Sequence, residues 1–307
     1  MLFSDFLAQS RAAGRPILMD GGMGTLLQTR GLAAKDPTEG WNLTHADVVT
    51  ELHCAYFDAG SQIVNTNTFQ VNPLRYSDED LASLIRAALG NALRARDGSV
   101  RPGEKFVSLD IGPLGRLIRP AGPLSYDEAK ACFRRIAELG CAGDVRADLV
   151  TVETMIDGRE AAAALEGIRE VTDLPVLVSC TFGKRGRTMM GDSPEKLASV
   201  LEPLGAAALG ANCSFGPEEL APVASAFLAA TKLPVLFKPN AGLPTVVTDG
   251  TGASAASHYE YGAAPADFAR TVARVASEGV ALVGGCCGTT PEYIARLGEE
   301  LEKLQEG

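Results

Sequence analysis

Eight short β-rich runs alternate with amphipathic helical segments, and this alternation limits the possible folds more than any other feature. Most runs are almost continuously apolar, which is typical of parallel strands buried on both faces. Eight strand–helix units in order favour a single-domain α/β fold, the (β/α)8 TIM barrel, over the alternative of an open, doubly wound sheet. The expected strands are Pro16–Asp20, Gln62–Thr66, Lys105–Asp110, Asp148–Glu153, Pro175–Cys180, Ala207–Cys213, Pro234–Pro239 and Val280–Cys286.

The segments between these runs carry apolar residues at helical spacing. Several begin with a capping residue, a first-turn proline and an acid, as in Ser193-Pro194-Glu195, which is typical of helix starts. The Gly- and Thr-rich stretch Ala241–Gly262 after the seventh strand is expected to be irregular. The expected helices are His45–Ala59, Glu79–Arg96, Tyr126–Cys141, Gly158–Val171, Pro194–Leu204, Pro217–Ala230, Pro265–Glu278 and Pro291–Lys303.

The 307 residues are enough for one α/β barrel, and we expect a single enzyme domain over residues 1–307. Lys and Arg number 28 against 38 Asp and Glu, and the net charge of -10 is not interrupted by a basic cluster. We therefore expect no binding to nucleic acid or to an anionic membrane. No apolar run reaches the ~18 residues that a membrane-spanning helix needs, and the N-terminus lacks the basic segment of a secretory signal. These features favour a cytoplasmic location.

Three of the 7 cysteines fall at the expected C-terminal ends of strands. Cys213 ends the sixth strand, and Cys286 and Cys287 end the eighth. Because these ends meet at one mouth of a barrel, the three thiols are expected to converge. Three thiolates with a fourth position left for substrate are the pattern of a catalytic Zn²⁺ site. Glycines on both sides of the adjacent pair give the backbone the freedom to aim two sulfurs at one ion.

Cysteine also serves as a small buried hydrophobic residue, and this is the alternative interpretation of the thiols. We apply it to Cys54, Cys132 and Cys141 in the expected helices, and to Cys180. A redox role for the adjacent pair is a further alternative, which the lack of a thioredoxin-like context disfavours.

Seven segments occur in the order found in homocysteine S-methyltransferases, so the chain resembles that family from Pro16 to the last helix. It is most similar to the homocysteine-binding module of cobalamin-dependent methionine synthase, and more distantly to betaine–homocysteine methyltransferase. The resemblance implies a (β/α)8 barrel with a three-cysteine zinc site, in agreement with the residues themselves. The segments are MDGGMGTLLQ, NTNTFQVN, DIGP, ETMIDGREA, GANCSFGP, PNAGLP and VGGCCGTTPEYI.

The resemblance also implies a complete set of metal ligands. Cys213, Cys286 and Cys287 are expected to bind the zinc, and Asn240 of PNAGLP to complete its coordination when no thiol is bound. A turn-forming role is the alternative for Asn240. Asp157, in another matched segment, is expected to act as scaffolding.

Substrate residues follow from the same resemblance. Asp20 and Glu153 match acids that hold the ammonium of L-homocysteine, and Gly21, Gly22 and Thr68 match segments around its carboxylate. A zwitterion needs an anion for the first group and amide or hydroxyl donors for the second. The alternatives are structural: strand-end acids bonded to helix N-termini, a tight turn at the two glycines, and a cap or loop hydroxyl at Thr68.

The expected activity is methyl transfer to homocysteine to form methionine. A free thiol with a pKa of ~8.5 is mostly protonated at neutral pH, whereas a zinc-bound thiol is a thiolate. The D-x-H-x-x-G corrinoid signature is missing, and we expect no folate, cobalamin or reactivation domain. The MDGGMGT and GRTMMGD stretches favour the methionine-synthase branch of the family, so the expected methyl donor is methylcobalamin on a corrinoid partner protein. The alternatives are S-methylmethionine, S-adenosylmethionine or betaine as donor, another acceptor thiol, or a non-catalytic zinc- or amino-acid-binding subunit of a methyltransferase complex.

Overall fold

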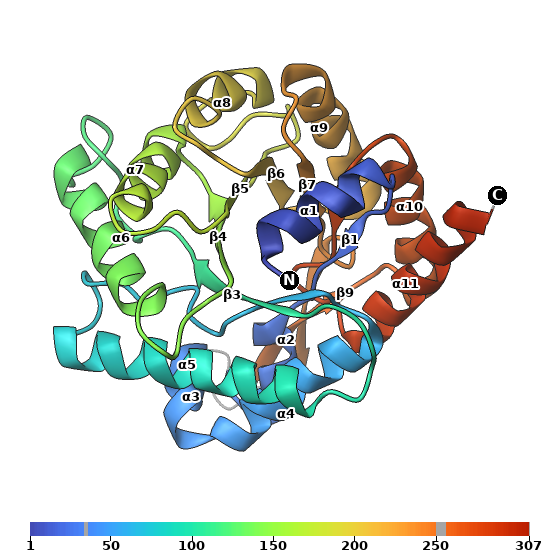
Figure 1. Ribbon diagram of the computed structural model, residues 1–307, viewed down its shortest axis with the longest axis horizontal. Coiled ribbons are helices and arrows are strands. Elements are labelled where there is room, and N and C mark those ends of the chain that lie inside the picture. Colours follow the sequence, from blue (N-terminus) through green and yellow to red (C-terminus); the bar gives the residue numbers. More distant parts are fainter. Residues whose placement is uncertain (34–35, 250–255, 307) are drawn as a thin grey trace.

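In the computed structural model, eight parallel strands form a barrel surrounded by helices (Figure 1). The barrel strands are β1 (Ile17–Leu18), β2 (Ile63–Asn65), β3 (Phe106–Ile111), β4 (Leu149–Met155), β5 (Val176–Cys180), β6 (Ala208–Asn212), β7 (Val235–Lys238) and β10 (Leu282–Val283). They pair in the order β1-β10-β7-β6-β5-β4-β3-β2, and a parallel bridge between Met19 and Ile63 joins the two ends. The structure describes residues 1–33, 36–249 and 256–306. The predicted (β/α)8 barrel is confirmed.

A helix follows each barrel strand and packs its apolar side against the sheet. These helices are α4 (Ala46–Ala59), α5 (Asp78–Gly98), α6 (Tyr126–Gly140), α7 (Gly158–Arg169), α8 (Pro194–Leu201), α9 (Pro217–Ala230), α10 (Pro265–Ser277) and α11 (Pro291–Glu306). Their bounds lie within a few residues of those predicted. Across the described ranges, no helix combines the length and hydropathy needed to cross a bilayer.

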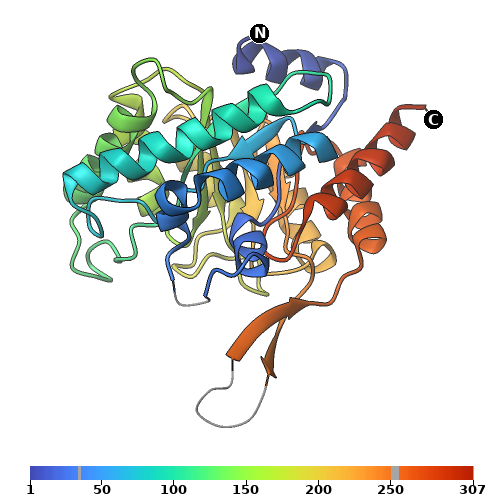
Figure 2. The same cartoon turned by 90° about the horizontal axis from the view of Figure 1, so that it is seen from below.

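The interior of the barrel begins with an apolar layer to which each strand contributes one side chain. The layer consists of Ile17, Ile63, Phe106, Leu149, Leu177, Ala208, Leu236 and Leu282. An N-terminal helix, α1 (Phe3–Ala12), covers this end of the barrel, and the ring of Phe3 lies edge-on to Phe106 at a centroid distance of 5.2 Å. Figure 2 shows α1 across one end of the barrel. The opposite end is therefore the one left for a site.

Side chains beyond this layer become polar towards the C-terminal ends of the strands. Alternate residues of a strand point to the same side, so on β3 the inward side chains run from Phe106 through Ser108 to Asp110. The same step of two leads from Leu149 to Glu153 on β4. The period of the strands thus places carboxylates at the barrel mouth above a sealed apolar floor.

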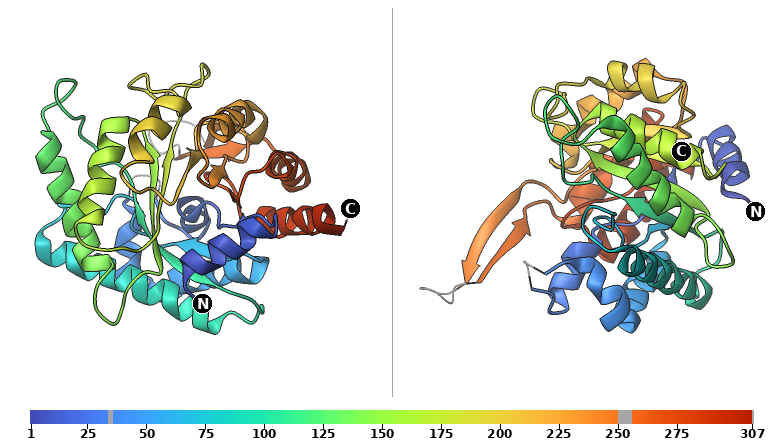
Figure 3. Two further views of the ribbon diagram at one scale, coloured as in Figure 1. Left: turned by 45° about the horizontal axis from the view of Figure 1, so that its top comes forward. Right: turned by 90° about the vertical axis from the view of Figure 1, so that its left-hand side faces the viewer.

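The stretch after β7 differs from the prediction. Within Ala241–Gly262, which was expected to be irregular, β8 (Pro244–Asp249) pairs antiparallel with β9 (Ala256–Tyr261). The Thr and Val residues at 245–248 favour a strand, and the composition of the whole stretch hid that local preference. Residues 250–255 lie outside the described residues. The hairpin projects from the barrel at the end opposite α1 (Figures 2 and 3).

The link from β1 to α4 folds into three short helices that the sequence did not predict. They are α2 (Met23–Thr29), η1 (Thr38–Gly40) and α3 (Trp41–Thr44). Asn67, just beyond β2, anchors this link by a hydrogen bond: its side-chain Nδ2 donates to the carbonyl of Thr38 at 2.8 Å. The link is thereby held over the mouth of the barrel.

Asp157 caps helix α7 and confirms the scaffolding role expected of it. Its Oδ1 accepts from the backbone N–H of Arg159 at 2.8 Å, and its side chain is buried. We expect Asp157→Ala to lower the free energy of unfolding by about 0.5–2 kcal/mol, because a helix N–H loses its acceptor. Asp157→Asn keeps that acceptor and should lose much less. Urea unfolding of both variants measures the difference; equal losses would contradict the capping role.

Candidate active site

The three predicted zinc ligands come together at the C-terminal end of the barrel. The Sγ atoms of Cys213, Cys286 and Cys287 lie within 4.8 Å of one another, and those of Cys213 and Cys287 are 3.9 Å apart. Zn–S bonds of ~2.3 Å at tetrahedral angles place sulfurs about 3.8 Å apart. Within the described part of the chain, this is the one cluster of three or more His, Cys, Asp or Glu side chains with metal-binding geometry. The residues present therefore fit a zinc ion.

The backbone bends sharply to present these sulfurs. Strand β6 ends at Asn212, one residue before the predicted end, because Cys213 and Ser214 both adopt φ of 64°. Non-glycine residues in this left-handed region cost about 1–3 kcal/mol each and cluster at functional sites. A Cβ on Gly285 would lie 2.2 Å from Thr289 Oγ1, so the turn before the adjacent cysteine pair requires glycine. Local strain and close packing thus aim the three thiols.

The thiols affect one another's protonation. Hydrogen bonds from Cys286 and Cys287 lower the pKa of Cys213. The same contact with Cys213, followed by that with Cys287 and by burial, raises the pKa of Cys286. One thiolate can be shared among the three sulfurs, but three thiolates at this spacing repel one another unless a cation lies between them. The donor set matches a soft divalent metal.

A cavity of about 300 Å³ adjoins the three sulfurs. Three of the predicted substrate residues, Asp20, Gly21 and Glu153, line it. Its volume suits a small amino acid. The arrangement places the cysteine cluster at one end of a pocket that has acids on its wall.

The other two predicted substrate residues lie behind this wall. The backbone N–H of Gly22 donates to the carbonyl of Thr289 at 2.9 Å. Thr68 is buried, and its hydroxyl donates to the carbonyl of Asp110 at 2.6 Å. Neither residue is among those that line the cavity. Their observed contacts shape the site from beneath.

Asn240 bridges the two halves of the cysteine cluster. Its Oδ1 accepts from the backbone N–H of Cys287 at 3.1 Å, and its side chain also hydrogen-bonds Cys213. Asn212 has a related role, since its Nδ2 lies 3.9 Å from Cys286 Sγ while its Oδ1 accepts from the backbone N–H of Thr154. Both amides fix the positions of sulfurs that approach from different strands.

The sequence analysis missed Lys238, the buried cation of the site. Its Nζ lies 2.9 Å from Asp20 Oδ1 and 3.6 Å from Glu153 Oε2. Burial opposes its charge, but the two carboxylates raise the pKa of Lys238 above its usual range. Burial raises the pKa of Asp20, and Lys238 acts against that rise. Lys238 is the last residue of β7. The strand-end argument that was applied to Asp20 and Glu153 would therefore have identified Lys238 as well.

Two further acids on the cavity wall were also missed. Asp110 lies near the end of β3 in the DIGP segment, and Glu39 belongs to η1. Burial, then the charge of Glu153, raises the pKa of Asp110 well above its usual range. Glu39 Oε1 accepts from the backbone N–H of Gln70 at 2.9 Å. The wall therefore carries four acids and one lysine.

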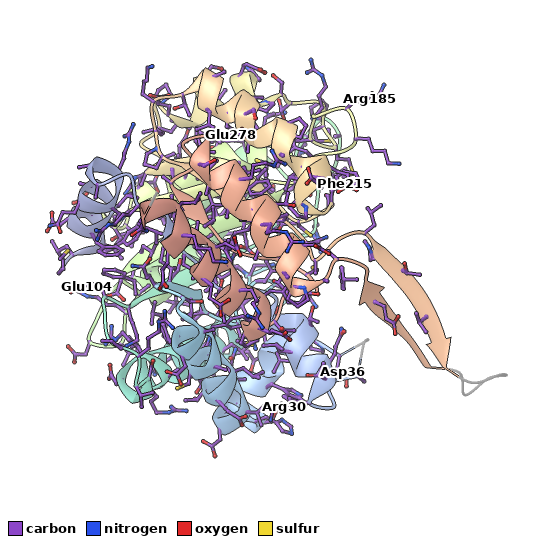
Figure 4. All side chains as sticks on the ribbon, turned by 90° about the vertical axis from the view of Figure 1, so that its right-hand side faces the viewer. Arg30, Asp36, Glu104, Arg185, Phe215 and Glu278 are labelled. Carbon is purple, nitrogen blue, oxygen red and sulfur yellow. The ribbon has the colours of Figure 1, made fainter. Side chains whose placement is uncertain are left out.

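The rim of the site includes the base of the hairpin. Tyr261 of β9 packs directly on Gly288, which has φ of 80°, and its hydroxyl hydrogen-bonds Cys287. Figure 4 shows Arg185, Phe215 and Asp36 at the end of the barrel from which the hairpin projects, and Glu104 at the opposite end. Tyr261 therefore partly covers the side of the cysteine cluster that lies next to the hairpin.

Comparison with known proteins identifies the family. The family model described as homocysteine S-methyltransferase matches residues 17–301. Methionine synthase of Mycobacterium leprae is 33% identical over 312 residues, and that of Mycobacterium tuberculosis is 33% identical over 308 residues. These alignments cover 96% and 95% of this chain but 25% of each relative, so the chain spans about a quarter of their length.

A solved structure shares the fold. The metallated form of the homocysteine methyltransferase MmuM from Escherichia coli superposes with a TM-score of 0.75 and 23% sequence identity, and covers 93% of this chain and 96% of that one. The match shows that the two chains share the barrel fold, and the family model shows the class of protein. The chain belongs to the homocysteine S-methyltransferase family, a family of methyltransferase enzymes.

Proposed function

We propose that this chain is a zinc-dependent homocysteine S-methyltransferase that forms methionine. The observation that carries the proposal is the cysteine cluster, with sulfurs within 4.8 Å of one another, beside a cavity whose wall carries four acids. Bound zinc would hold the homocysteine sulfur as a thiolate at neutral pH. Cys213, Cys286 and Cys287 are the proposed ligands, and Asn240 is the proposed fourth ligand in the absence of substrate.

The remaining residues bind and orient the amino acid in this proposal. Its ammonium faces the acidic wall, where Glu153 and Asp20 supply negative charge, and its carboxylate lies on the side of Gly21. Gly22 and Thr68 support that side through their backbone and hydroxyl contacts. Methyl transfer is then a displacement at carbon in which correct positioning of the sulfur matters most.

The methyl donor we propose is methylcobalamin carried by a corrinoid protein, and the cytoplasm is the proposed location. Support comes from the relatives named methionine synthase, of which this chain spans about a quarter. A turnover assay with the purified chain, L-homocysteine and methylcobalamin tests the proposal, with methionine as the measured product. Parallel assays with S-methylmethionine, S-adenosylmethionine and betaine identify a different donor. Homocysteine binding without turnover with any donor would favour a non-catalytic subunit.

Replacing Glu153 tests substrate recognition. We expect Glu153→Gln to weaken L-homocysteine binding by about 10- to 100-fold, because a charge-assisted hydrogen bond to an ammonium contributes ~1.5–3 kcal/mol. Zinc content should stay unchanged. Isothermal titration calorimetry measures the affinity. Glu299→Gln, on the exposed side of α11, is the control and should bind normally. Unchanged affinity in Glu153→Gln would assign that acid a structural role.

A further inference from the structure

The three cysteines of the cluster all line the cavity, and each is only half-buried. In the proposed function, homocysteine adds a fourth sulfur beside them, so the methyl donor meets four thiolates of which one should react. Methylation of a cysteine would turn a thiolate ligand into a thioether and remove its charge from the centre. The cavity alone does not hide the cysteine sulfurs, so their reactivity must be lowered in another way.

Amide side chains bond two of the three sulfurs from outside the cluster. Asn240 hydrogen-bonds Cys213, and Asn212 Nδ2 lies 3.9 Å from Cys286 Sγ. Both amides are buried. A donor withdraws negative charge from a thiolate, and the nucleophilicity of a thiolate falls as its basicity falls. Hydrogen bonds of this kind therefore make a ligand sulfur a weaker nucleophile and leave its position unchanged.

The third sulfur, that of Cys287, is bonded by a residue of the projecting hairpin. Tyr261 is the last residue of β9, where it pairs with Pro244 of β8, and its hydroxyl hydrogen-bonds Cys287. Its ring fills the space over Gly288, where a Cβ would lie 2.3 Å from the ring. Tyr261 is not among the residues that line the cavity. It therefore reaches the sulfur from outside the cavity.

The base of the hairpin is bonded to the loop that carries Cys287. The backbone N–H of Ala241 donates to the carbonyl of Cys287 at 2.9 Å, and the N–H of Ala263 donates to the carbonyl of Ala241 at 2.9 Å. The carbonyl of Ala263 accepts from the hydroxyl of Tyr293 in α11 at 2.6 Å. These contacts hold both legs of the hairpin against the cysteine loop and fix Tyr261 relative to the sulfur that it bonds.

We infer that Tyr261 is a positioning residue that keeps the sulfur of Cys287 from being methylated, so that the methyl group goes to the substrate sulfur. A phenol keeps its proton at neutral pH, so its hydroxyl donates to the thiolate and weakens the attack of that sulfur on carbon. A thiol bound inside the cavity receives no such bond from Tyr261, because Tyr261 lies outside it. The inference rests on the proposed function and adds to it the choice among the four sulfurs.

Methylation of the protein's own cysteines tests this role. Zinc-loaded wild type and Tyr261→Phe are treated with iodomethane in the absence of homocysteine. A thiolate sulfur bonds the methyl carbon as the carbon–iodine bond breaks and iodide leaves. Peptide mass spectrometry measures the rates of methylation at Cys287 and Cys213. We expect the ratio of the Cys287 rate to the Cys213 rate to be about 5- to 10-fold higher in Tyr261→Phe, with unchanged zinc content.

The ratio separates the role of the hydroxyl from a general loosening of the site. An unchanged ratio overturns the role of Tyr261 and leaves the proposed function standing. A parallel rise at both cysteines, as expected from loss of zinc, leaves the ratio unchanged and overturns it in the same way. A wild type that binds no zinc, or that forms no methionine with any donor in the turnover assay, overturns the inference and the proposed function together.

Tyr126→Phe is the matched control, because it removes a tyrosine hydroxyl that bonds Glu166, away from the cluster. It should keep the wild-type ratio. Tyr261→Phe keeps the ring that packs on Gly288, so we expect it to fold with the wild-type melting temperature. Tyr261→Leu, which also lacks the hydroxyl, replaces it in the comparison if it does not fold.

Discussion

Cys213→Ala is expected to lower the zinc content of the purified protein from about one ion per chain to a small fraction of that. Cys213 directly follows β6, and its Sγ lies 3.9 Å from the Sγ of Cys287, which follows β10. Without it, two adjacent thiolates remain, and two ligands bind zinc far more weakly than three. Methionine formation should fall to background. Inductively coupled plasma mass spectrometry measures the metal, and the turnover assay measures the activity.

The same loss is expected for Cys286→Ala and Cys287→Ala. Cys54→Ala is the matched control, because Cys54 lies in α4 with its thiol bonded to Asp58 and outside the cluster. It should keep both zinc and activity. Full zinc retention in Cys213→Ala would rule out the three-cysteine centre. Retained activity after complete zinc removal would rule out a catalytic role for the metal.

The second large effect is expected from Lys238→Met. Lys238 is 3% exposed and bonded to Asp20, and methionine has a similar length without a charge. The replacement leaves the buried carboxylates of Asp20 and Glu153 without their cation. Removal of one partner of a buried ion pair costs about 3–5 kcal/mol, so we expect the free energy of unfolding to fall by that amount at neutral pH. Urea unfolding measures it.

The loss should depend on pH in a defined direction. Burial raises the pKa of both Asp20 and Glu153 above their usual values, and without Lys238 the rise should be larger. An acid with a raised pKa binds its proton more tightly in the folded chain, so stability falls as pH rises from its unfolded pKa of ~4 through the folded value. The difference in free energy of unfolding between the wild type and Lys238→Met should therefore be smaller near about pH 4 than near about pH 7.5. Lys303→Met, an exposed residue paired with Glu300, should show no deficit at either pH.

The eight strand–helix units and the cysteine cluster were predictable because both depend on local sequence pattern. Strand ends in a barrel converge, so Cys213 and Glu153 could be assigned to the mouth before any contact was known. The same rule applies to Lys238 and Asp110, but the family resemblance drew attention to other positions. A strand-end position shows that a residue faces the mouth, and it does not show which residue will be its partner.

Long-range contacts explain what the sequence did not predict. Thr68 lies behind the cavity because it bonds the backbone of Asp110, 42 positions away. Helix α1 covers the barrel floor through Phe3 and Leu7, and an apolar pair in a short N-terminal segment does not indicate what it will cover. The prediction of an irregular stretch at Ala241–Gly262 was wrong because it rested on the Gly and Thr content of the whole stretch. Two short segments within that stretch pair with each other as a hairpin.

The layered interior of the barrel has an evolutionary consequence. On β3 the step from Phe106 to Asp110 moves from the floor that stabilises the fold to the wall of the cavity, and both side chains belong to one strand. A substitution at the wall position leaves the floor and the strand pairing intact. New substrate preferences can therefore arise on this scaffold through replacements at the wall that leave the apolar floor unchanged, because the floor and the wall occupy different levels of the same strands.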